Sequence, residues 1–548
     1  MKITPAQIGK ILLKGSYISQ TDFDMATSEA KKRRVDLIQY LLSANIINKN
    51  LLGQAMAEHF DLPYADLGKN IPAPEQVLKI PEKIAKKYNI ALFSETDKQI
   101  TISTCDPENK EIIQALKKIF KEKKIQLAYS VQEDIQGVFT NYRTTLDTRF
   151  GKIIKSQNQI APTIIDEILK DALSFNASDI HFEPQEKEAL IRFRVDGILE
   201  EAGRIDKSYY ANIVNRIKIL ALLRIDEHSV TQDGALRFNE SWGKIDLRVS
   251  IVPTVYGEKV VLRILSQHVG ILSLDSIGFS AHDQAIITKS VHRPFGMILA
   301  VGPTGSGKTV TIYSLINLIN NSRINITSIE DPVECVIHGA NQIQVTKHIP
   351  FARGLRSIVR QDPDVILVGE IRDRETAEIA VNAALSGHLL FSTFHANNTS
   401  TVVSRLIDMG VEPFILASTL ELIISQRLAR RICVSCRYSS TISKDEFQKI
   451  SANKKLLKQF GFTKNTMLYR GKGCPACNHT GYKGRVALFE ILPASPAIRQ
   501  KILENPSAEE IWAEARKEGV RSLFEDGLEK IKLGLTTFEE LFRVAAID

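Results

Sequence analysis

Apolar and polar residues follow two different spacings along this chain, and the spacing changes several times. Residues 1–70 place apolar side chains at helical intervals, and the segment at 11–19 returns loosely at 40–48, which predicts an imperfect helical repeat. Residues 71–140 mix helical stretches with alternating ones such as QITIST (99–104), a pattern typical of half-buried strands. The sequence therefore predicts a helical domain followed by a small α/β domain.

The pattern changes again in the second half of the chain. Residues 141–160 carry few apolar anchors and predict a linker. Residues 161–270 begin with a helical pattern and continue with alternating positions, which predicts a β-rich domain. Within 285–548, strand-like and helical runs alternate as in a parallel sheet covered by helices, and the tail at 496–548 has amphipathic helical spacing. We therefore expect an α/β multidomain protein.

Composition narrows the class of protein. The chain has 548 residues, several times the length of about 100–200 residues that is usual for one domain. Its 44% hydrophobic and 24% charged residues exclude a wholly disordered or fibrous class. A net charge of +8 is too dilute over this length to require nucleic acid as a partner. We expect a cytoplasmic location, because no segment has the apolar run of a membrane span and the first residues lack a signal-peptide pattern.

The segment GPTGSGKT (302–309) matches the pattern of a phosphate-binding loop, since it follows an apolar strand-like run and precedes a helical one. In such a loop, backbone amides surround phosphate oxygens, the lysine bridges the β- and γ-phosphates, and the hydroxyl group holds Mg²⁺. A plain glycine turn is the alternative, and the strand–loop–helix context disfavours it. The predicted nucleotide-binding residues are Gly302, Pro303, Thr304, Gly305, Ser306, Gly307, Lys308 and Thr309.

Two acidic strand ends accompany this loop. DPDVILVGE (362–370) ends in Glu370, which predicts a carboxylate beside Mg²⁺, with a helix cap or ion pair as the alternative. ITSIEDPVE ends in a proline turn with Glu330, Asp331 and Glu334. Like charges crowded in this way favour catalysis over an exposed acidic turn, because they need a cation or a water molecule between them.

Two histidines border another strand-like run, LLFSTF. His388 precedes it and His395 follows it closely, so either imidazole could donate a hydrogen bond to a γ-phosphate. The alternative is a packed histidine with ordinary partners.

Four cysteines form two C-x-x-C pairs in the insert at 431–485. Such pairs present two thiolates each to one tetrahedral Zn²⁺, so we expect a structural zinc site; redox pairs or free thiols are the alternative. Two further cysteines, Cys105 and Cys335, lack partners and are expected to be buried apolar residues. The predicted ligands are Cys433, Cys436, Cys474 and Cys477.

In chain order, GPTGSGKT, SIEDPVE, DPDVILVGEIRD and GHLLFSTFHAN resemble the Walker A, Asp box, Walker B and His box motifs of the secretion ATPase superfamily. With its cysteine module and long N-terminal region, the chain is similar to the type IV pilus extension ATPases and the type II secretion ATPases. The resemblance implies a RecA-like motor domain preceded by a PAS-like β-rich domain. It also implies a homo-hexamer that hydrolyses ATP and turns an inner-membrane platform protein, with membrane association only through such partners.

The resemblance also assigns roles to individual residues. Glu334 corresponds to the glutamate that polarises the attacking water, Glu370 to the Walker B acid and His395 to the His-box sensor. Arg248 and Arg263 correspond to arginines that complete the active site across a subunit boundary, where they would neutralise charge on the transferring phosphoryl group. Ion pairing on a sheet face is the alternative role for these arginines.

The chain departs from the family pattern at two places. The family often has an arginine where this chain has Ala235, and Arg237 stands two positions further on. The N-terminal repeat resembles a module that binds cyclic di-GMP in some relatives through Arg-Leu-Gly, but Gln7 and Asp36 replace the two arginines. We therefore expect residues 1–70 to dock a protein.

Several functions stay open at this point. Type IV pilus assembly is the leading hypothesis. A type II secretion motor is the second, because the sequence motifs hardly distinguish the two functions. A nucleic-acid translocase is disfavoured because basic residues are not gathered with interleaved aromatics. A nucleotide-binding scaffold without turnover is the remaining alternative.

Overall fold

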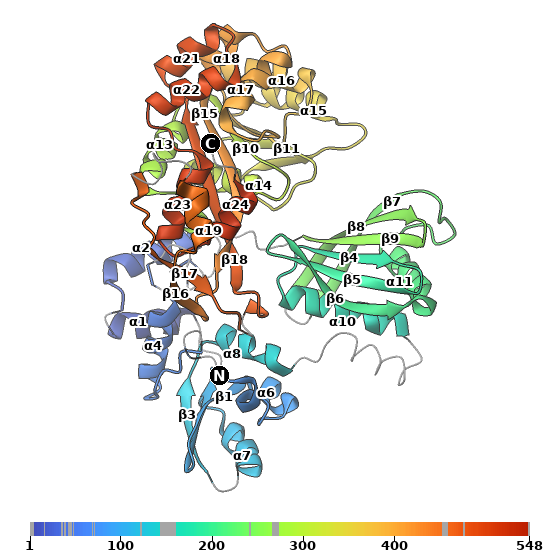
Figure 1. The fold of residues 1–548 in the computed structure, drawn as a ribbon, viewed down its shortest axis with the longest axis vertical. Helices are drawn as coiled ribbons and strands as arrows, with labels where there is room; N and C mark the ends of the chain where they lie inside the picture. The colour runs from blue at the N-terminus through green and yellow to red at the C-terminus, as the bar shows by residue number, and fades with distance from the viewer. Residues whose placement is uncertain are drawn as a thin grey trace. The chain divides into compact units, whose positions relative to one another are not determined.

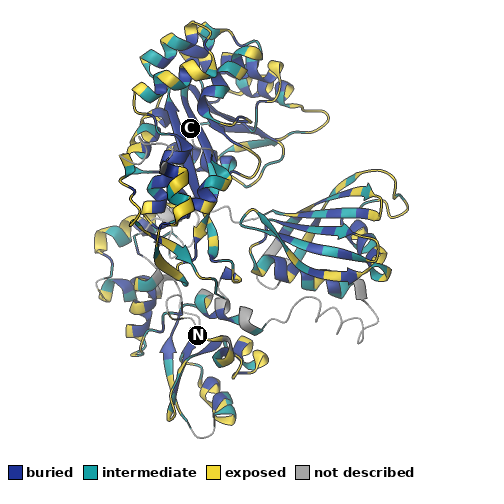
Figure 2. Ribbon diagram, viewed as in Figure 1, coloured by how far each residue is buried: buried dark blue, intermediate teal, exposed yellow. Residues whose placement is uncertain are grey.

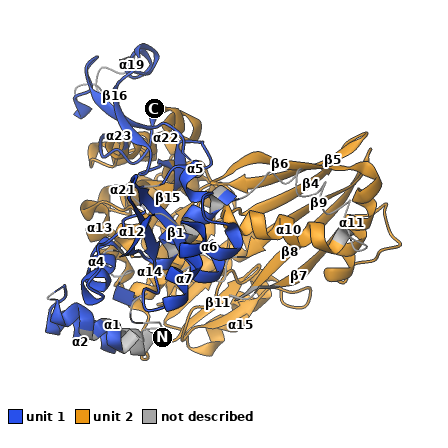
Figure 3. Cartoon of the chain, turned by 90° about the horizontal axis from the view of Figure 1, so that it is seen from below, with its two compact units in different colours: residues 1–143, 431–484, 531–537 blue, residues 144–430, 485–530, 538–548 orange. Residues whose placement is uncertain are grey.

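The structure is a computed structural model of the chain, and it describes residues 5–545. The residues outside the description are 1–4, 16, 34–36, 38–39, 42–45, 48, 68–69, 71, 121–122, 143–159, 241–242, 266–272, 452–458, 475–476 and 546–548. Most of the predicted linker, and Asp36 of the N-terminal repeat, lie outside the described residues. The chain divides into two compact units, one formed by residues 1–143, 431–484 and 531–537 and the other by the remainder (Figure 3).

The N-terminal region is helical at first and then mixed, as the apolar spacing predicts. Its sheet has the order β1-β2-β3, with β1 and β2 antiparallel and β2 and β3 parallel. Residues 63–65 attach to this sheet, because the N–H of Ala65 donates to Tyr129 O (2.8 Å). The elements are α1 (Pro5–Lys14), α2 (Gln20–Arg33), α4 (Lys49–His59), α5 (Pro74–Val77), α6 (Glu82–Tyr88), β1 (Ile90–Glu95), β2 (Gln99–Thr104), α7 (Lys110–Ile119), β3 (Lys124–Tyr129) and α8 (Gln132–Val138).

The β-rich domain is a six-stranded antiparallel sheet with the order β6-β5-β4-β9-β8-β7. Alternate strand residues such as Phe182, Phe193 and Leu262 are buried against α10 and α11, so the two helices cover one face. Burial alternates along these strands (Figure 2), which leaves the other face to charged residues. The elements are α10 (Ile160–Ser174), β4 (Asp179–Pro184), β5 (Glu188–Val195), β6 (Ile198–Asp206), α11 (Lys207–Leu220), β7 (Gln232–Glu240), β8 (Gly243–Thr254) and β9 (Gly257–Leu265).

The domain that the resemblance identifies as the motor domain is built on a seven-stranded sheet with the order β12-β11-β13-β14-β10-β15-β18. Figure 1 labels β10, β11, β15 and β18 of this sheet. Within the described residues, the pairings of β10, β11, β12, β13, β14 and β15 with one another are parallel, which confirms the predicted parallel core. The strand-like runs of the sequence in this domain, GMILAV, INITSIE, DVILVGE and LLFSTF, form β10, β11, β13 and β14. The strands are β10 (Gly296–Val301), β11 (Ile326–Glu330), β12 (Asn341–Gln344), β13 (Val365–Val368), β14 (Leu389–Phe394), β15 (Leu420–Ile432) and β18 (Tyr482–Pro493).

Helices cover both faces of this sheet. Along β10, Met297, Leu299 and Val301 pack into one apolar cluster, whereas Ile298 and Ala300 pack into a second. A strand buried on both sides needs an unbroken apolar run, which is what GMILAV supplies. The helices are α12 (Leu274–Ile277), α13 (Ala281–Val291), α14 (Lys308–Ile319), α15 (Phe351–Ile358), α16 (Arg374–Leu385), α17 (Thr399–Asp408), α18 (Pro413–Thr419), α21 (Pro496–Leu503), α22 (Ala508–Lys517), α23 (Leu523–Lys532) and α24 (Phe538–Val544).

Among the described residues of the cysteine insert, the apolar side chains of Ile442, Ile450, Phe462 and Leu468 are buried. Its described elements are an antiparallel hairpin of β16 (Arg437–Thr441) and β17 (Met467–Gly471), with α19 (Lys444–Ser451) between the two strands. Within the described residues, no helix combines the length and apolarity that crossing a bilayer requires.

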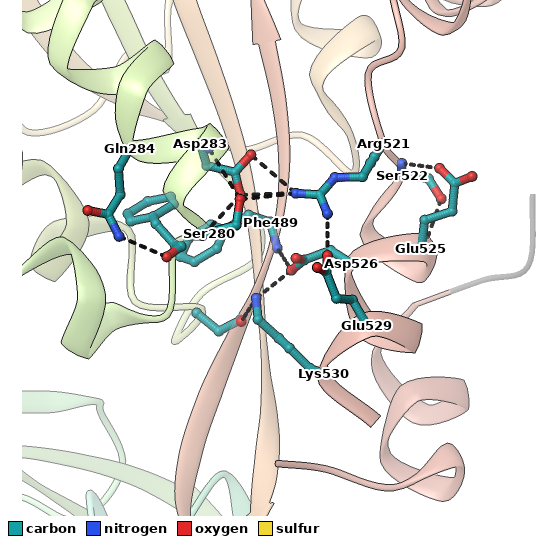
Figure 4. A network of polar contacts seen from close by, with 12 residues as sticks. Ser280, Asp283, Gln284, Phe489, Arg521, Ser522, Glu525, Asp526, Glu529 and Lys530 are labelled. Carbon is teal, nitrogen blue, oxygen red and sulfur yellow. Dashed lines mark hydrogen bonds and ion pairs between the residues drawn. The ribbon is translucent and has the colours of Figure 1, made fainter. Parts of the chain in front are cut away.

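Buried charges fix α23 to the motor sheet (Figure 4). The Asp526 carboxylate accepts hydrogen bonds from the Phe489 N–H on β18 (2.8 Å) and from Lys530 Nζ (2.5 Å). Arg521, just before α23, contacts Asp283 on α13 (3.3 Å). Because Asp526 and Lys530 are almost fully buried, each charge depends on the other for compensation.

Replacing Asp526 with alanine tests this dependence. Asp526→Ala leaves the Lys530 ammonium buried without its carboxylate, so we expect the free energy of unfolding to fall by about 3–5 kcal/mol in urea denaturation. Glu529→Gln is the matched control, because it breaks an ion pair with Arg521 whose carboxylate side is 45% exposed, and such pairs contribute at most about 1 kcal/mol. Equal losses in the two variants would contradict the argument.

Candidate functional site

The segment 302–309 joins the end of β10 to the start of α14, as the motif predicts. Gly307 has φ 89°, so it turns the chain into the helix with a backbone conformation that favours glycine. Gly302 is packed so closely that a Cβ there would lie 2.5 Å from Gln426 O. The loop is therefore pressed against β15, and the N-terminal amides of α14 face outward from the sheet edge.

Lys308 is the buried cation of this loop. Its Nζ donates to Gly302 O (2.7 Å) and Pro303 O (3.1 Å), so the ammonium folds back over its own loop. Burial lowers the pKa of Lys308 to about 8; Glu370 opposes this shift and the charge of Arg427 adds to it. Ser306 is also buried, and among the described residues its Oγ has no hydrogen-bond partner. A cation with depressed pKa beside an unsatisfied hydroxyl group fits a site for a polyanion.

The structure brings Lys308, Glu370 and His395 together. Glu370 lies just beyond β13 with 12% of its side chain exposed, and it pairs with Arg372 and approaches His395 Nε2 at 3.6 Å. Burial and the positive charges of Lys308 and Arg372 hold the pKa of His395 below its usual value, while Glu370 opposes them. A neutral imidazole next to a carboxylate can donate or accept a hydrogen bond. Thr309 follows on the first turn of α14 and is half-buried.

The two histidines that the sequence singled out lie at opposite edges of the sheet. His388 precedes β14, and its Nδ1 lies 2.8 Å from Ala383 O, so it has an ordinary partner away from the loop. His395 follows β14 at the carboxyl edge, where Arg405 donates to its carbonyl oxygen (2.5 Å). Only His395 of the pair therefore lies beside Lys308.

The three carboxylates after β11 differ in their surroundings. Glu330 is buried and accepts hydrogen bonds from Tyr313, Ser328 (2.6 Å) and Gln342 (3.1 Å). Its carboxylate is therefore satisfied by hydrogen bonds within the core, apart from the crowded acidic group for which the sequence favoured catalysis. Glu334 is exposed on the loop beyond β11. Since β11 is parallel to β13, β13 to β14 and β14 to β10, that loop and the phosphate loop leave the same edge of the sheet.

Arg248 and Arg263 lie in the β-rich domain and face one another across β8 and β9. The row continues through Asp179 on β4 to Arg194 on β5, so three arginines and one carboxylate line up across four strands. Asp179 contacts Arg263 (3.0 Å) and Arg194 (3.7 Å). The predicted ion pairing therefore exists for Arg263, whereas Arg248 is exposed.

The row of arginines also shows the consequence of having Ala235 where the family often has an arginine. Ala235 on β7 stands directly opposite Arg248, so the row ends there without a fourth arginine. Arg237 pairs with Asp246 on β8 (2.5 Å) and is thereby held along the sheet. Arg237 does not take the place that Ala235 leaves.

The four cysteines of the two C-x-x-C pairs converge. Their Sγ atoms all lie within 4.8 Å of one another, and three of the separations are 3.7–3.9 Å. Tetrahedral zinc with Zn–S bonds of about 2.3 Å requires sulfurs about 3.8 Å apart, so the donor set fits a metal ion. The Sγ of Cys477 also accepts hydrogen bonds from the N–H groups of Cys474 (3.2 Å) and Gly481 (3.3 Å), which favours a thiolate.

Sequence reasoning missed two residues of the phosphate site. Gln426 and Arg427 on β15 lie against the loop, where Gln426 accepts a hydrogen bond from Thr311 on α14 (2.7 Å). They follow the loop by more than a hundred residues, in the segment QRLARRICVSC, whose likeness to the secretion ATPase superfamily assigned them no role. Only the pairing of β15 with β10 could have located them.

Comparison with protein families covers most of the chain. The family model "Type II/IV secretion system protein" matches residues 154–543, and the "MshEN domain" model matches residues 60–148. Together the two models span the mixed N-terminal domain, the β-rich domain, the motor domain and the cysteine module.

Comparison with individual proteins gives the same assignment. The chain is 36% identical to the type IV pilus assembly ATPase PilB of Myxococcus xanthus, over 99% of both chains. It is 43% identical to the type II secretion system protein E of Dickeya dadantii, over 70% of this chain and 75% of that protein. Among solved structures, the Legionella pneumophila ATPase DotB has the same fold, with a TM-score of 0.52 and 22% identity over 71% of this chain and 97% of DotB.

The pKa of Lys308 predicts how nucleotide affinity depends on pH. Between pH 8 and 9.5 the free protein loses the Lys308 proton, whereas a bound triphosphate favours the charged form, so we expect affinity for ATP to fall by up to about tenfold per pH unit. Fluorescent-nucleotide titrations measure this. In Lys308→Arg the side chain keeps its positive charge, so the affinity for ATP should not change between pH 8 and 9.5. A flat profile in the unaltered protein would contradict the prediction.

Proposed function

Since the chain belongs to the type II/IV secretion system protein family and is an ATPase of that family, we propose that its ATP hydrolysis drives type IV pilus assembly. The observation that carries this proposal is the extent of the similarity. The pilus assembly relative from Myxococcus xanthus matches 99% of this chain, whereas the secretion relative from Dickeya dadantii matches 70%. Part of the chain therefore has a counterpart in the pilus ATPase alignment that the secretion alignment does not reach.

The phosphate site supports ATP as the substrate. Lys308 and the amides of the loop would hold the β- and γ-phosphates, and Thr309 together with Glu370 would hold Mg²⁺ directly or through water. Mg²⁺ would neutralise charge on the phosphates when bound. Glu330 takes no part in this role, because its donors already satisfy it.

We assign the chemical step to Glu334 and His395. Glu334 is an exposed carboxylate at the carboxyl edge of the sheet and would orient and deprotonate the attacking water. His395 approaches Glu370 and has a lowered pKa, so near neutral pH it would donate one N–H toward the transferring phosphoryl group.

Arg248 and Arg263 would act from a neighbouring subunit of a homo-hexamer. The row through Asp179 supports this proposal. Arg263 and Arg194 share the Asp179 carboxylate, and the exposed Arg248 stands next to Arg263, so the row carries an excess of positive charge. Such a surface would stabilise the charge that develops on a phosphoryl group. In this proposal the ring lies in the cytoplasm and reaches the inner membrane only through a platform protein.

A type II secretion motor is the second candidate function. It is favoured by the higher identity, 43%, over the part of the chain that aligns with the secretion protein from Dickeya dadantii. Deleting the gene and scoring surface pili against secreted enzymes separates the two: loss of secretion with normal pili would overturn the pilus assignment.

Glu334→Gln tests the proposed reaction. The variant should still bind ATP, because the phosphate loop is intact, but kcat should fall by about 10²–10⁴-fold because the water loses its base. In a deletion strain it should also fail to restore surface pili. Asp275→Asn on α12 is the matched control and should retain wild-type turnover. Undiminished hydrolysis by Glu334→Gln would defeat the assignment.

The cysteine cluster is proposed to hold one structural Zn²⁺ per chain. Metal analysis of the purified protein should give one zinc, and Cys433→Ser or a strong chelator should remove it and increase proteolysis within 431–485. Cys335→Ser should keep its zinc, since that thiol lies outside the cluster. A fully occupied zinc site in Cys433→Ser would show that the cluster is not the site.

A further inference from the structure

Arg427 on β15 lies next to the phosphate loop and close to Gly302. β15 runs parallel to β10, with Val301 paired to Ser425, so the two residues that follow on β15 lie beside the loop. A Cβ placed on Gly302 would lie 3.1 Å from an Nη atom of Arg427. The guanidinium group is therefore in contact range of the first residue of the loop.

The same guanidinium group holds the loop that carries His395. Arg427 Nη2 donates to Asn397 O at 2.7 Å, while Nη1 donates to the carbonyl oxygen of Gln426 at 3.1 Å. On the other side, Arg405 donates to the carbonyl oxygen of His395. Two arginines thus anchor the short segment between β14 and α17, and one of them also touches the phosphate loop.

A buried carboxylate fixes the far end of this segment. Glu490 on β18 accepts hydrogen bonds from the N–H (2.8 Å) and Oγ1 (2.7 Å) of Thr399, the first residue of α17. Glu490 also attracts Arg427 electrostatically, although burial outweighs it and lowers the pKa of Arg427. The segment 395–398 is therefore clamped between β15, β18 and α17.

The charges make this arrangement sensitive to a polyanion. Arg427 is half-buried and repels Lys308, which is itself buried in the loop. Phosphate groups at the loop would attract both cations and relieve their repulsion, so the guanidinium group would gain a second partner close to its present one. A shift of Arg427 toward the loop would pull on Asn397 and through it on His395.

We propose that Arg427 is a positioning residue that couples occupation of the phosphate loop to the placement of His395. It acts through the Asn397 carbonyl oxygen and does not itself perform the chemical step. The inference deepens the proposed ATPase function and rests on it.

A double-mutant cycle in the full-length protein tests the coupling. Arg427→Gln should lower kcat at least tenfold while raising KM for ATP less than about threefold, because substrate binding keeps Lys308 and the loop amides. If Arg427 acts through His395, then His395→Ala and Arg427→Gln combined should lower kcat no further than the more severe single variant. Arg427→Lys should recover part of the loss. Arg431→Gln, an exposed arginine at the end of β15, is the matched control and should behave as wild type.

Hydrogen–deuterium exchange supplies a readout that does not depend on turnover. Adding Mg²⁺ and the analogue AMP-PNP to the wild-type chain should slow amide exchange in residues 395–401, and this protection should be lost in Arg427→Gln although the analogue still binds.

Multiplicative effects of the two substitutions on kcat, or equal protection in wild type and Arg427→Gln, would overturn the coupling. If the wild-type chain hydrolyses ATP in that case, the proposed function stands without it. Absence of wild-type hydrolysis would overturn both.

Discussion

The motor domain depends on a constraint that is electrostatic as much as steric: a lysine ammonium is buried in a glycine loop where backbone carbonyl oxygens are its nearest partners. Lys308 contacts two carbonyl oxygens of its own loop, and its pKa of about 8 reflects the cost of removing the charge from water. Glu370 is the carboxylate that opposes this cost, but it also pairs with Arg372. The site therefore carries more positive than negative charge, and a polyphosphate is the kind of ligand that balances it.

The parallel sheet explains how these charged groups come together. Carboxyl ends of parallel strands share one edge, so Glu370 after β13, His395 after β14 and the loop after β10 meet although they are far apart in sequence. The strands are apolar on both faces, and the helices that cover them supply the core. Asp526 and Lys530, by contrast, are buried as a compensated pair in which each is also hydrogen-bonded to the backbone of β18. Buried charge in this domain is thus paired where it is structural and left in excess at the phosphate loop.

The features that were predicted correctly from the sequence are those that depend on residues close to one another in the chain. The loop at 302–309, the apolar strands and the paired cysteines each follow from residues a few positions apart, and the structure places them as expected. Glu330 was grouped with its acidic neighbours because the sequence cannot show that Tyr313 from α14 and Gln342 donate to it. Gln426 and Arg427 were missed because their position depends on a strand pairing between distant segments. The pairing of Arg263 with Asp179 joins residues 84 positions apart and was open for the same reason.

β15 and β18 lie on the side of β10 that faces away from β14. Through the backbone, they connect the sheet edge that carries the phosphate loop to the cysteine module, a connection that the sequence motifs do not describe. β15 carries Arg427 and continues directly into Cys433, and β18, which carries Glu490, begins soon after Cys477. The two strands that hold the segment 395–398 are therefore also the strands by which the chain enters and leaves the cysteine module. Strands within a sheet resist bending because their backbone hydrogen bonds and packing act together. If phosphate contacts move Arg427 against Glu490, the displacement is borne by these two strands rather than by a loop.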